Sequence, residues 1–372
     1  MNAKGLRIGL VGPLPPPSGG MANQTRQLGT LLQQEGAMVE LVQVNPPYPA
    51  WVANLRWVRE PFRLFPYAIN LWRTAGKVQL LHVMANSGWS WHLIAAPAIW
   101  VAKLRGIAVV VNYRGGGAEA FFARSFSLVR PSLRRADAVV VPSGFLEQVF
   151  ARRGIAARII PNIIDLTRFS SHGAADRVTA QGPPHIIVTR NLEKIYDIGS
   201  ALRAFALLRL RFPEARLTIA GSGPERQTLE ALAASLGFGN TVTFTGQLEN
   251  AEMADLYRTA TIMLNPSLVD NMPISILESL ASGVPVVSTN VGGVPHLVQD
   301  GETALLVPPG SPEPMAEAMS RITVDKILAR RLSEVGSAAV QVYAWPNVRD
   351  RLFEVYARVT AGAQPAVTAV GK

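Results

Sequence analysis

Cysteine is absent from the 372-residue sequence. Its absence excludes disulfide bonds, cysteine nucleophiles and thiolate metal ligands. Charged residues are also scarce, at 17% against 48% hydrophobic residues, which argues against a disordered chain and indicates a core-forming protein. No Asp-x-Asp motif occurs, and we therefore expect no metal site.

The sequence also lacks an apolar run long enough to cross a bilayer. The longest candidate, residues 93–102, has about half the required length and is interrupted by Pro97. The N-terminus leads from a short polar start straight into a strand-like run, without the pattern of an export signal. We therefore expect a cytoplasmic protein.

Positive charge is concentrated in the N-terminal half. Residues 1–180 contain 20 Lys and Arg against 8 Asp and Glu, whereas residues 181–372 contain 16 against 18. Six of the seven tryptophans also lie in the first half. Arginines beside aromatic residues at 48–73 favour an anionic membrane surface or an acidic ligand, and a peripheral position at the inner face of the membrane is one hypothesis. The alternative is that amphipathic helices pack these aromatics into the N-terminal core.

Short β-branched runs alternate with helical patterns along the whole chain, which predicts parallel sheets built from βαβ units. The expected fold class is α/β, with two Rossmann-like doubly wound domains facing across a cleft. Ligands of such sheets bind at the carboxyl ends of the strands. The predicted strands are residues 6–11, 38–44, 78–84, 107–113 and 138–142, followed by 185–189, 216–221, 241–245, 261–265, 284–288 and 304–307.

Composition suggests where these domains begin and end. We predict an N-terminal domain over residues 1–168 and a C-terminal domain over residues 185–344. Ser, Gly and Pro cluster in the stretch 169–184, which is typical of a linker. A final helix at 345–360 is a candidate to cross back to the first domain, and the small, polar tail 361–372 is expected to be disordered.

The most informative segment, residues 265–293, is predicted to run from strand to loop to helix to strand. Pro273 suits the first helical turn, and Gly283 suits the C′ position. Amides at the helix N-terminus, around Asn271, Met272 and Ile274, favour an anion such as a diphosphate.

Two acidic residues lie eight positions apart in this segment, Asp270 in the loop and Glu278 in the helix. Carboxylates at this spacing are suited to accept hydrogen bonds from two separate groups of hydroxyls. The segment resembles the donor-binding motif of glycosyltransferase family 4, in which two glutamates are separated by seven residues. The resemblance implies that Glu278 binds the donor ribose and that Asp270, in the place of the first glutamate, meets the donor sugar.

The resemblance extends over residues 6–310. It implies that Arg190 binds the diphosphate, together with Lys194, which falls one position early. It also assigns Gly221 to the strand and Gly-x-Gly-Pro motif, and Gly246 to the strand end that lines the pocket for the nucleotide base. The alternatives without a ligand are an ordinary turn for the glycines, and a surface or helix-capping residue for Arg190.

In the N-terminal domain, Gly19 and Gly20 resemble the Gly-Gly turn of the family, which faces the donor phosphate or the acceptor. Arg114 stands where many members have a histidine that contacts the donor sugar. The resemblance places Arg114 near the reacting carbon, where it would stabilise the negative charge of the leaving group. The expected catalytic residues are thus Asp270, Arg190 and Arg114.

The resemblance implies a GT-B fold and a retaining, metal-independent glycosyltransferase. Such an enzyme moves a hexosyl group from a nucleoside diphosphate sugar to an acceptor hydroxyl, here on a glycan or glycolipid such as a lipid-linked or polysaccharide precursor. We expect a UDP- or GDP-sugar as co-substrate, no cofactor and no nucleic acid. The alternatives are a nucleotide-sugar epimerase on the same fold, and a basic protein that binds membranes or nucleic acid without catalysis.

Overall fold

The computed structural model describes residues 3–16, 19–48 and 61–362. They form two compact units: unit 1 comprises Met1–Pro161 and Pro346–Lys372, and unit 2 comprises Asn162–Trp345. Each unit contains a six-stranded sheet whose strand pairs are all parallel. The α/β fold with two Rossmann-like domains is therefore confirmed.

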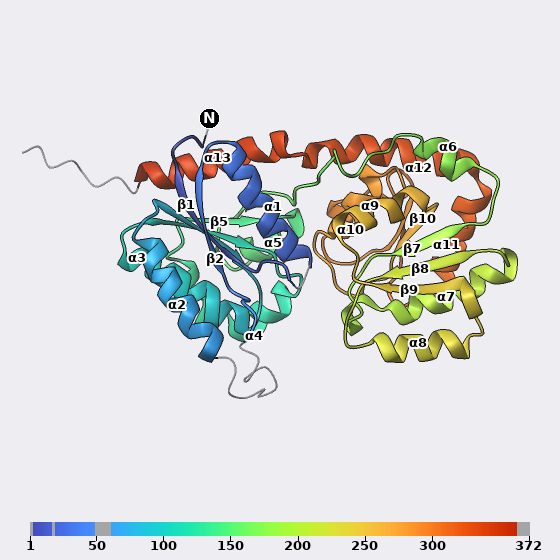
Figure 1. Cartoon of the computed structure of the whole chain (residues 1–372), viewed down its shortest axis with the longest axis horizontal. Coiled ribbons are helices and arrows are strands. Elements are labelled where there is room, and N and C mark those ends of the chain that lie inside the picture. Colours follow the sequence, from blue (N-terminus) through green and yellow to red (C-terminus); the bar gives the residue numbers. More distant parts are fainter. Residues whose placement is uncertain (1–2, 17–18, 49–60, 363–372) are drawn as a thin grey trace, which may run out of the picture. The chain divides into compact units, whose positions relative to one another are not determined.

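The sheet of unit 1 has the strand order β2-β1-β3-β4-β5-β6. Strands β3 and β4 are completely buried, as expected for parallel strands covered by helices on both faces. Helices α2 to α5 share one hydrophobic core, and Figure 1 shows α1 and α13 on the other side of this sheet. The strands are β1 (Arg7–Gly12), β2 (Met38–Gln43), β3 (Leu80–Ala85), β4 (Ala108–Tyr113), β5 (Ala138–Val141) and β6 (Arg158–Ile159). The helices are α1 (Gly20–Gln34), α2 (Pro61–Ala75), α3 (Ala96–Leu104), α4 (Ala118–Leu133), α5 (Gly144–Ala151) and α13 (Trp345–Gly362), with a π-helical turn at Trp91–Ala95.

The sheet of unit 2 has the order β12-β11-β10-β7-β8-β9. Its strand order reverses between β7 and β10, which is where open α/β sheets bind ligands. Helices α7, α8 and α11 contribute to one core cluster, and α9 and α10 to another. The strands are β7 (His185–Val188), β8 (Arg216–Ala220), β9 (Val242–Gly246), β10 (Ile262–Asn265), β11 (Val286–Thr289) and β12 (Leu305–Val307). The helices are α6 (Ala174–Thr179), α7 (Ile198–Arg211), α8 (Arg226–Ser235), α9 (Asn250–Thr259), α10 (Ile274–Ala281), α11 (Pro312–Val324) and α12 (Lys326–Ala339).

The compact units divide the chain at different residues from the predicted domains. Unit 2 begins at Asn162, and the stretch predicted as a linker, residues 169–184, contains α6. The Arg177 side chain of α6 donates hydrogen bonds to the carbonyls of Ala260 and Ser282. Such contacts between distant segments leave no local pattern in the sequence. For this reason a short helix among Ser and Gly residues resembles a linker when the sequence is considered alone.

The last helix, α13, belongs to unit 1 from Pro346 onward. It buries Leu352 and Val355 among others, and Arg349 forms an ion pair with Glu35 at 3.2 Å. Of the tail predicted to be disordered, residues 363–372 lie outside the described residues. No helix in the described part of the chain is both long and apolar enough to span a membrane.

Candidate active site

An ion pair between Arg190 and Asp270 lies at the switch point of the unit 2 sheet. Arg190 follows β7 and Asp270 follows β10, and these strands are neighbours. Arg190 Nη2 lies 2.5 Å from Asp270 Oδ2, and the two side chains are only 11% and 10% exposed. Arg190 Nη1 also lies 3.5 Å from Ser275 Oγ, and the guanidinium stacks over the Tyr196 ring at 4.1 Å. Arg190 Nε is buried without a hydrogen-bond partner among the described residues, so its N–H donor is unused there.

A pair of glycines after β11 fixes the loop that carries Asp270. The Gly293 amide donates to the Asp270 carbonyl at 3.1 Å. A Cβ atom on Gly292 would lie 2.0 Å from the Asp270 carbonyl oxygen, and one on Gly293 would lie 1.9 Å from that of Asn271. Both positions therefore require glycine for the loop to keep its present path.

Helix α10 begins directly after this loop. Pro273 is its N-cap and Ile274 its first residue, so Pro273 lies one position before the predicted first turn. Gly283 follows the C-cap with φ +63°, which confirms its predicted place at C′. Asn162 holds the entry to the helix, because its Nδ2 donates to the Met272 carbonyl at 2.7 Å. The first amides of α10 have no intrahelical acceptor and favour an anion here.

Glu278 lies one turn into α10 and contacts Tyr257 of α9. The Tyr257 hydroxyl lies 3.3 Å from Glu278 Oε2, 3.0 Å from the Ser275 carbonyl and 2.8 Å from Thr189 Oγ1. Burial raises the pKa of Glu278 to about 7, although the Tyr257 hydrogen bond and the charges of Arg168 and Arg190 lower it. The Glu278 carboxyl therefore titrates near neutral pH.

One predicted glycine, Gly221, lies beside the backbone of Arg190, and a second, Gly246, is hydrogen-bonded to Gly221. The Gly221 amide donates to the Gly246 carbonyl at 2.8 Å, and a Cβ on Gly221 would lie 2.0 Å from the Arg190 carbonyl oxygen. Gly221 thus allows the close approach of the loop that contains Arg190. The sequence motif alone does not distinguish this structural role from contact with a ligand. Contact of either glycine with a donor stays a prediction.

Lys194 is set apart from this cluster. It begins a short 3-10 turn, Lys194–Tyr196, and its side chain is exposed. No hydrogen bond or ion pair joins it to Arg190 or Asp270 within the described ranges, although the Ile195 carbonyl accepts from the Leu268 amide at 2.8 Å. The structure therefore brings Arg190, Asp270, Asn271, Ile274 and Glu278 to one sheet edge and leaves Lys194 at the surface.

In unit 1, the predicted glycines form the start of α1. Gly19 is the N-cap and Gly20 the first helical residue, and the Asn23 amide donates to the Gly19 carbonyl at 2.9 Å. No Cβ contact within 4 Å would oppose a side chain at Gly19. The neighbouring Ser18 lies outside the described residues.

Arg114 follows β4 and is hydrogen-bonded to a chain of buried polar groups. Its Nε donates to Asn112 Oδ1 at 3.2 Å, Asn112 Nδ2 lies 3.0 Å from His82 Nε2, and His82 Nδ1 lies 2.7 Å from the Tyr356 hydroxyl. Burial lowers the pKa of Arg114 to about 10, which leaves it protonated at neutral pH. Burial and the charge of Arg114 lower the pKa of His82 to about 3, so His82 is neutral.

Several of these contact residues were not predicted. None of the three tyrosines Tyr196, Tyr257 and Tyr356 lies in a motif. Their partners, Arg190, Glu278 and His82, belong to other elements of the fold. Their only sequence signal is a buried aromatic with a polar tip, a residue type that usually finds a hydrogen-bond partner.

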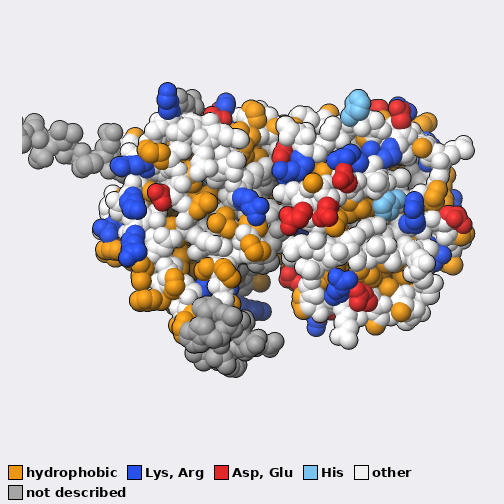
Figure 2. Space-filling model, in the orientation of Figure 1, with side chains coloured by type: hydrophobic (Ala, Val, Ile, Leu, Met, Phe, Trp, Pro, Cys, Tyr) orange, Lys and Arg blue, Asp and Glu red, His pale blue; other side chains and the backbone are white. Residues whose placement is uncertain are grey.

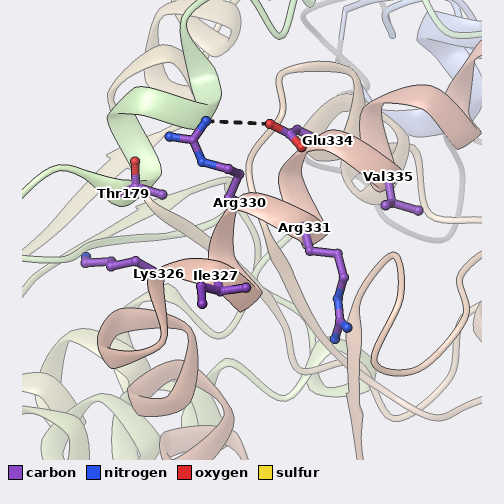
Figure 3. Close-up of a pocket in the computed structure, with 7 residues that line it drawn as sticks. All are labelled: Thr179, Lys326, Ile327, Arg330, Arg331, Glu334 and Val335. Atoms are coloured by element: carbon purple, nitrogen blue, oxygen red, sulfur yellow. Dashed lines mark ion pairs between the residues drawn. The ribbon is translucent and has the colours of Figure 1, made fainter.

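A separate hollow lies between α6 and α12, lined by Thr179, Lys326, Ile327, Arg330, Arg331, Glu334 and Val335 (Figure 3). Its cations already have partners: Arg330 pairs with Glu334 at 3.7 Å, and Arg331 donates to the Gly301 carbonyl at 2.9 Å. None of the predicted site residues lines it. Within the described residues, no group of three or more His, Asp or Glu side chains is arranged to hold a metal ion.

Comparison with known families finds two matches in this chain. Residues 18–168 match the family described as Glycosyltransferase Family 4, and residues 175–338 match the family described as Glycosyl transferases group 1. The two matches fall one on each half of the chain.

Individual relatives agree with these families. Phosphatidyl-myo-inositol mannosyltransferase of Mycobacterium tuberculosis is 25% identical over 97% of this chain and 100% of its own length. D-inositol 3-phosphate glycosyltransferase of Corynebacterium jeikeium is 28% identical over 54% of this chain and 51% of its own length. The chain spans about half the length, or less, of the first curated relatives that it matches. These relatives are transferases, and the epimerase and non-catalytic alternatives are not favoured.

Solved structures share the fold. Sucrose-phosphate synthase from Thermosynechococcus elongatus superposes with a TM-score of 0.77 at 23% identity, covering 96% of this chain and 100% of that chain. Anabaena Alr3699/HepE in complex with UDP and glucose superposes with a TM-score of 0.73 at 17% identity, covering 95% and 99%. At these identities the likeness establishes the two-domain architecture alone.

Proposed function

Because the chain belongs to the family 4, group 1 glycosyltransferases, we propose that it moves a hexosyl group from a nucleoside diphosphate sugar to an acceptor hydroxyl, with retention of the anomeric configuration and without a metal ion. The observation that carries this proposal is the cluster at the switch point of unit 2. There Arg190 lies within hydrogen-bond distance of Asp270 and of Ser275, which belongs to the first turn of α10. Glu278 lies one turn further along the same helix.

Each part of the cluster suits one part of the donor. The Glu278 carboxylate would accept hydrogen bonds from the ribose hydroxyls. Arg190 and the first amides of α10 would hold the diphosphate, since a guanidinium and a helix N-terminus both favour phosphate oxygens. Asp270 would meet the sugar hydroxyls. UDP- and GDP-sugars are the donors we propose, and a structural neighbour in complex with UDP and glucose supports the first.

The same charges suggest how the reaction proceeds. The bond between the anomeric carbon and the β-phosphate oxygen breaks while the acceptor oxygen attacks from the same face. The acceptor proton passes to the departing phosphate, so no carboxylate nucleophile is required. Arg190 and the helix amides would stabilise the negative charge that develops on the diphosphate, which is why we propose that no metal ion or cofactor takes part. Arg114 would contribute a second fixed cation.

Unit 1 is the proposed site of the acceptor, and a face of α2 supports a lipid-linked one. Phe62, Phe65, Ile69 and Trp72 follow one side of the helix and are 38%, 70%, 38% and 45% exposed. Arg105 stacks over the Trp72 ring at 3.8 Å. Hydrophobic side chains gather over α2 and α3 in this part of unit 1 (Figure 2).

An apolar stripe beside arginines is suited to an anionic lipid surface. We therefore propose peripheral binding at the inner face of the membrane. A relative matched over its full length is named for transfer to phosphatidyl-myo-inositol, which supports a glycolipid acceptor. Of the basic and aromatic stretch predicted from sequence, residues 49–60 lie outside the described residues.

A donor panel tests the proposal. Binding of UDP-, GDP- and ADP-sugars would be measured by calorimetry for the wild type, for Glu278→Ala and for Glu334→Ala, an exposed glutamate of the same unit. We expect one donor to bind, Glu278→Ala to weaken it by about 10- to 100-fold through loss of a charged hydrogen-bond acceptor, and Glu334→Ala to leave it unchanged. Proton NMR of the product would then report the anomeric configuration, and chelator should leave the rate unchanged. Failure of every donor to bind, or equal affinity in Glu278→Ala, would contradict the assignment.

A further inference from the structure

A chain of three buried polar side chains joins the last helix of the protein to Arg114. Tyr356 of α13 is 2% exposed, His82 of β3 is 0% exposed and Asn112 of β4 is 1% exposed. Their polar atoms lie 2.7, 3.0 and 3.2 Å apart along the path from Tyr356 through His82 and Asn112 to Arg114 Nε. Tyr356 and His82 are 274 residues apart in sequence.

The chemistry of each group fixes the direction of these hydrogen bonds. Arginine only donates, so the Asn112 oxygen must face Arg114 and the Asn112 amide nitrogen must face His82. That nitrogen donates to His82 Nε2, which leaves the single proton of the neutral imidazole on Nδ1. His82 Nδ1 therefore donates to the Tyr356 hydroxyl, and every link has one permitted orientation.

We infer that Tyr356, His82 and Asn112 form a positioning chain that fixes the guanidinium plane of Arg114 for the transfer reaction. The inference rests on the proposed function, in which Arg114 acts on the leaving group. Tyr356 contributes because it is the acceptor at the end of the chain.

Removal of the Tyr356 hydroxyl would disturb the chain link by link. Without it, the His82 proton on Nδ1 is buried and unpaired, a costly state. If the proton moved to His82 Nε2, two donors would face each other, the Nε2–H group and the Asn112 amide nitrogen. If the Asn112 amide then rotated by 180°, its nitrogen would face Arg114 Nε–H, which again places two donors together. Either change displaces the guanidinium, and a displacement of about 1 Å at a reacting group costs about 100-fold in rate.

The test compares two buried tyrosines of unit 1. Tyr356→Phe is expected to lower kcat by about 10- to 100-fold. The KM for the donor should change less than about twofold, because the proposed contacts to its ribose and sugar lie in unit 2. Tyr67→Phe is the matched control, because it also removes a buried hydroxyl hydrogen bond, to the Ile94 carbonyl at 2.8 Å. We expect it to lower the melting temperature and to leave kcat unchanged.

A double-mutant cycle separates positioning from general destabilisation. In an Arg114→Lys background, Tyr356→Phe should cause no further loss of kcat, since the group that it positions is already gone. His82→Leu breaks the chain one link closer to Arg114, should cause the same loss, and serves if Tyr356→Phe cannot be purified. A loss that is equally large with and without Arg114, or wild-type kcat in both chain variants, overturns the inference.

A readout without turnover distinguishes this inference from the proposed function. The Arg114 Nε–H signal, identified in nitrogen-edited NMR spectra by its disappearance in Arg114→Lys, should shift or broaden in Tyr356→Phe and stay in place in Tyr67→Phe. An unchanged signal in Tyr356→Phe overturns the positioning chain even if the enzyme is active. A shifted signal in a protein that transfers no sugar supports the chain and refutes the proposed function.

Discussion

Donor affinity is predicted to rise with pH, because Glu278 must lose its proton to accept hydrogen bonds from both ribose hydroxyls. Burial raises its pKa from the usual 4.5 to about 7. Below that pKa, each pH unit lowers the ionised fraction, and with it the apparent affinity, tenfold. Between about pH 8 and about pH 6 the ionised fraction falls roughly tenfold, and Kd should increase by the same factor, or about 1.4 kcal/mol.

Calorimetric titration with the nucleotide sugar found in the donor panel would measure this slope. A nucleotide sugar is preferable to a free nucleotide, since its phosphates have no terminal group that titrates near neutrality. Glu278→Gln is the matched control, because it keeps the size of the side chain and cannot ionise. Its Kd should be the same at both pH values. A wild-type Kd independent of pH, or a slope that persists in Glu278→Gln, would refute the role assigned to this carboxyl.

The same pKa predicts an effect on stability with a definite sign. A carboxyl whose pKa is raised by folding contributes stability that is fully present below about pH 4.5 and is lost as the pH rises through about 7. Over that window the loss is about 3 kcal/mol. Glu278→Gln should therefore be more stable than the wild type near pH 8 and equal to it near pH 4.5 in thermal melts without ligand.

Three further perturbations have expected outcomes. Asp270→Asn leaves Arg190 buried without its counter-charge and should lower the free energy of unfolding by about 1–3 kcal/mol in urea titrations, whereas Asp270→Glu should lose less. Gly292→Ala would bring a Cβ within 2.0 Å of the Asp270 carbonyl and should abolish measurable donor binding; Gly301→Ala, which has a similar positive φ but open space around it, should retain it. The pair Phe65→Ser and Trp72→Ser should each weaken sedimentation with anionic vesicles by about tenfold through loss of buried apolar area, with Leu210→Ser, exposed on unit 2, as a control without effect.

Local sequence patterns predicted the parts of the fold that depend on neighbouring residues. Glycine at C′ and alternation of β-branched runs with helices are short-range signals, so Gly283 and most strands were placed correctly. The two-residue strand β6 was missed, because so few residues carry no periodicity. The six-residue helix α6 was missed as well; its Arg177 side chain donates hydrogen bonds to two carbonyls that are distant in sequence, and such contacts leave no local pattern.

The sequence indicated which residues belong to the candidate site, but it did not indicate the contacts among them. Arg190 and Asp270 were each assigned to the donor, but their mutual ion pair joins residues 80 positions apart. Glu278 was identified from its motif, whereas the Tyr257 hydroxyl beneath it has no motif of its own. Lys194 was assigned to the diphosphate by resemblance; it begins the 3-10 turn at Lys194–Tyr196 with an exposed side chain, and its contact with a donor stays a prediction.

Unit 1 consists of two stretches of chain that are separated in the sequence by the whole of unit 2. His82 and Asn112 are made early, but the hydroxyl that accepts the His82 proton is added 274 residues after His82, roughly 10–60 s later at ordinary elongation rates. During that time the nascent sheet lacks α13, and one buried polar side chain, His82, lacks its final partner. Unit 2 is one continuous stretch and needs no such delay. The unit that is synthesised first is therefore the last to be completed.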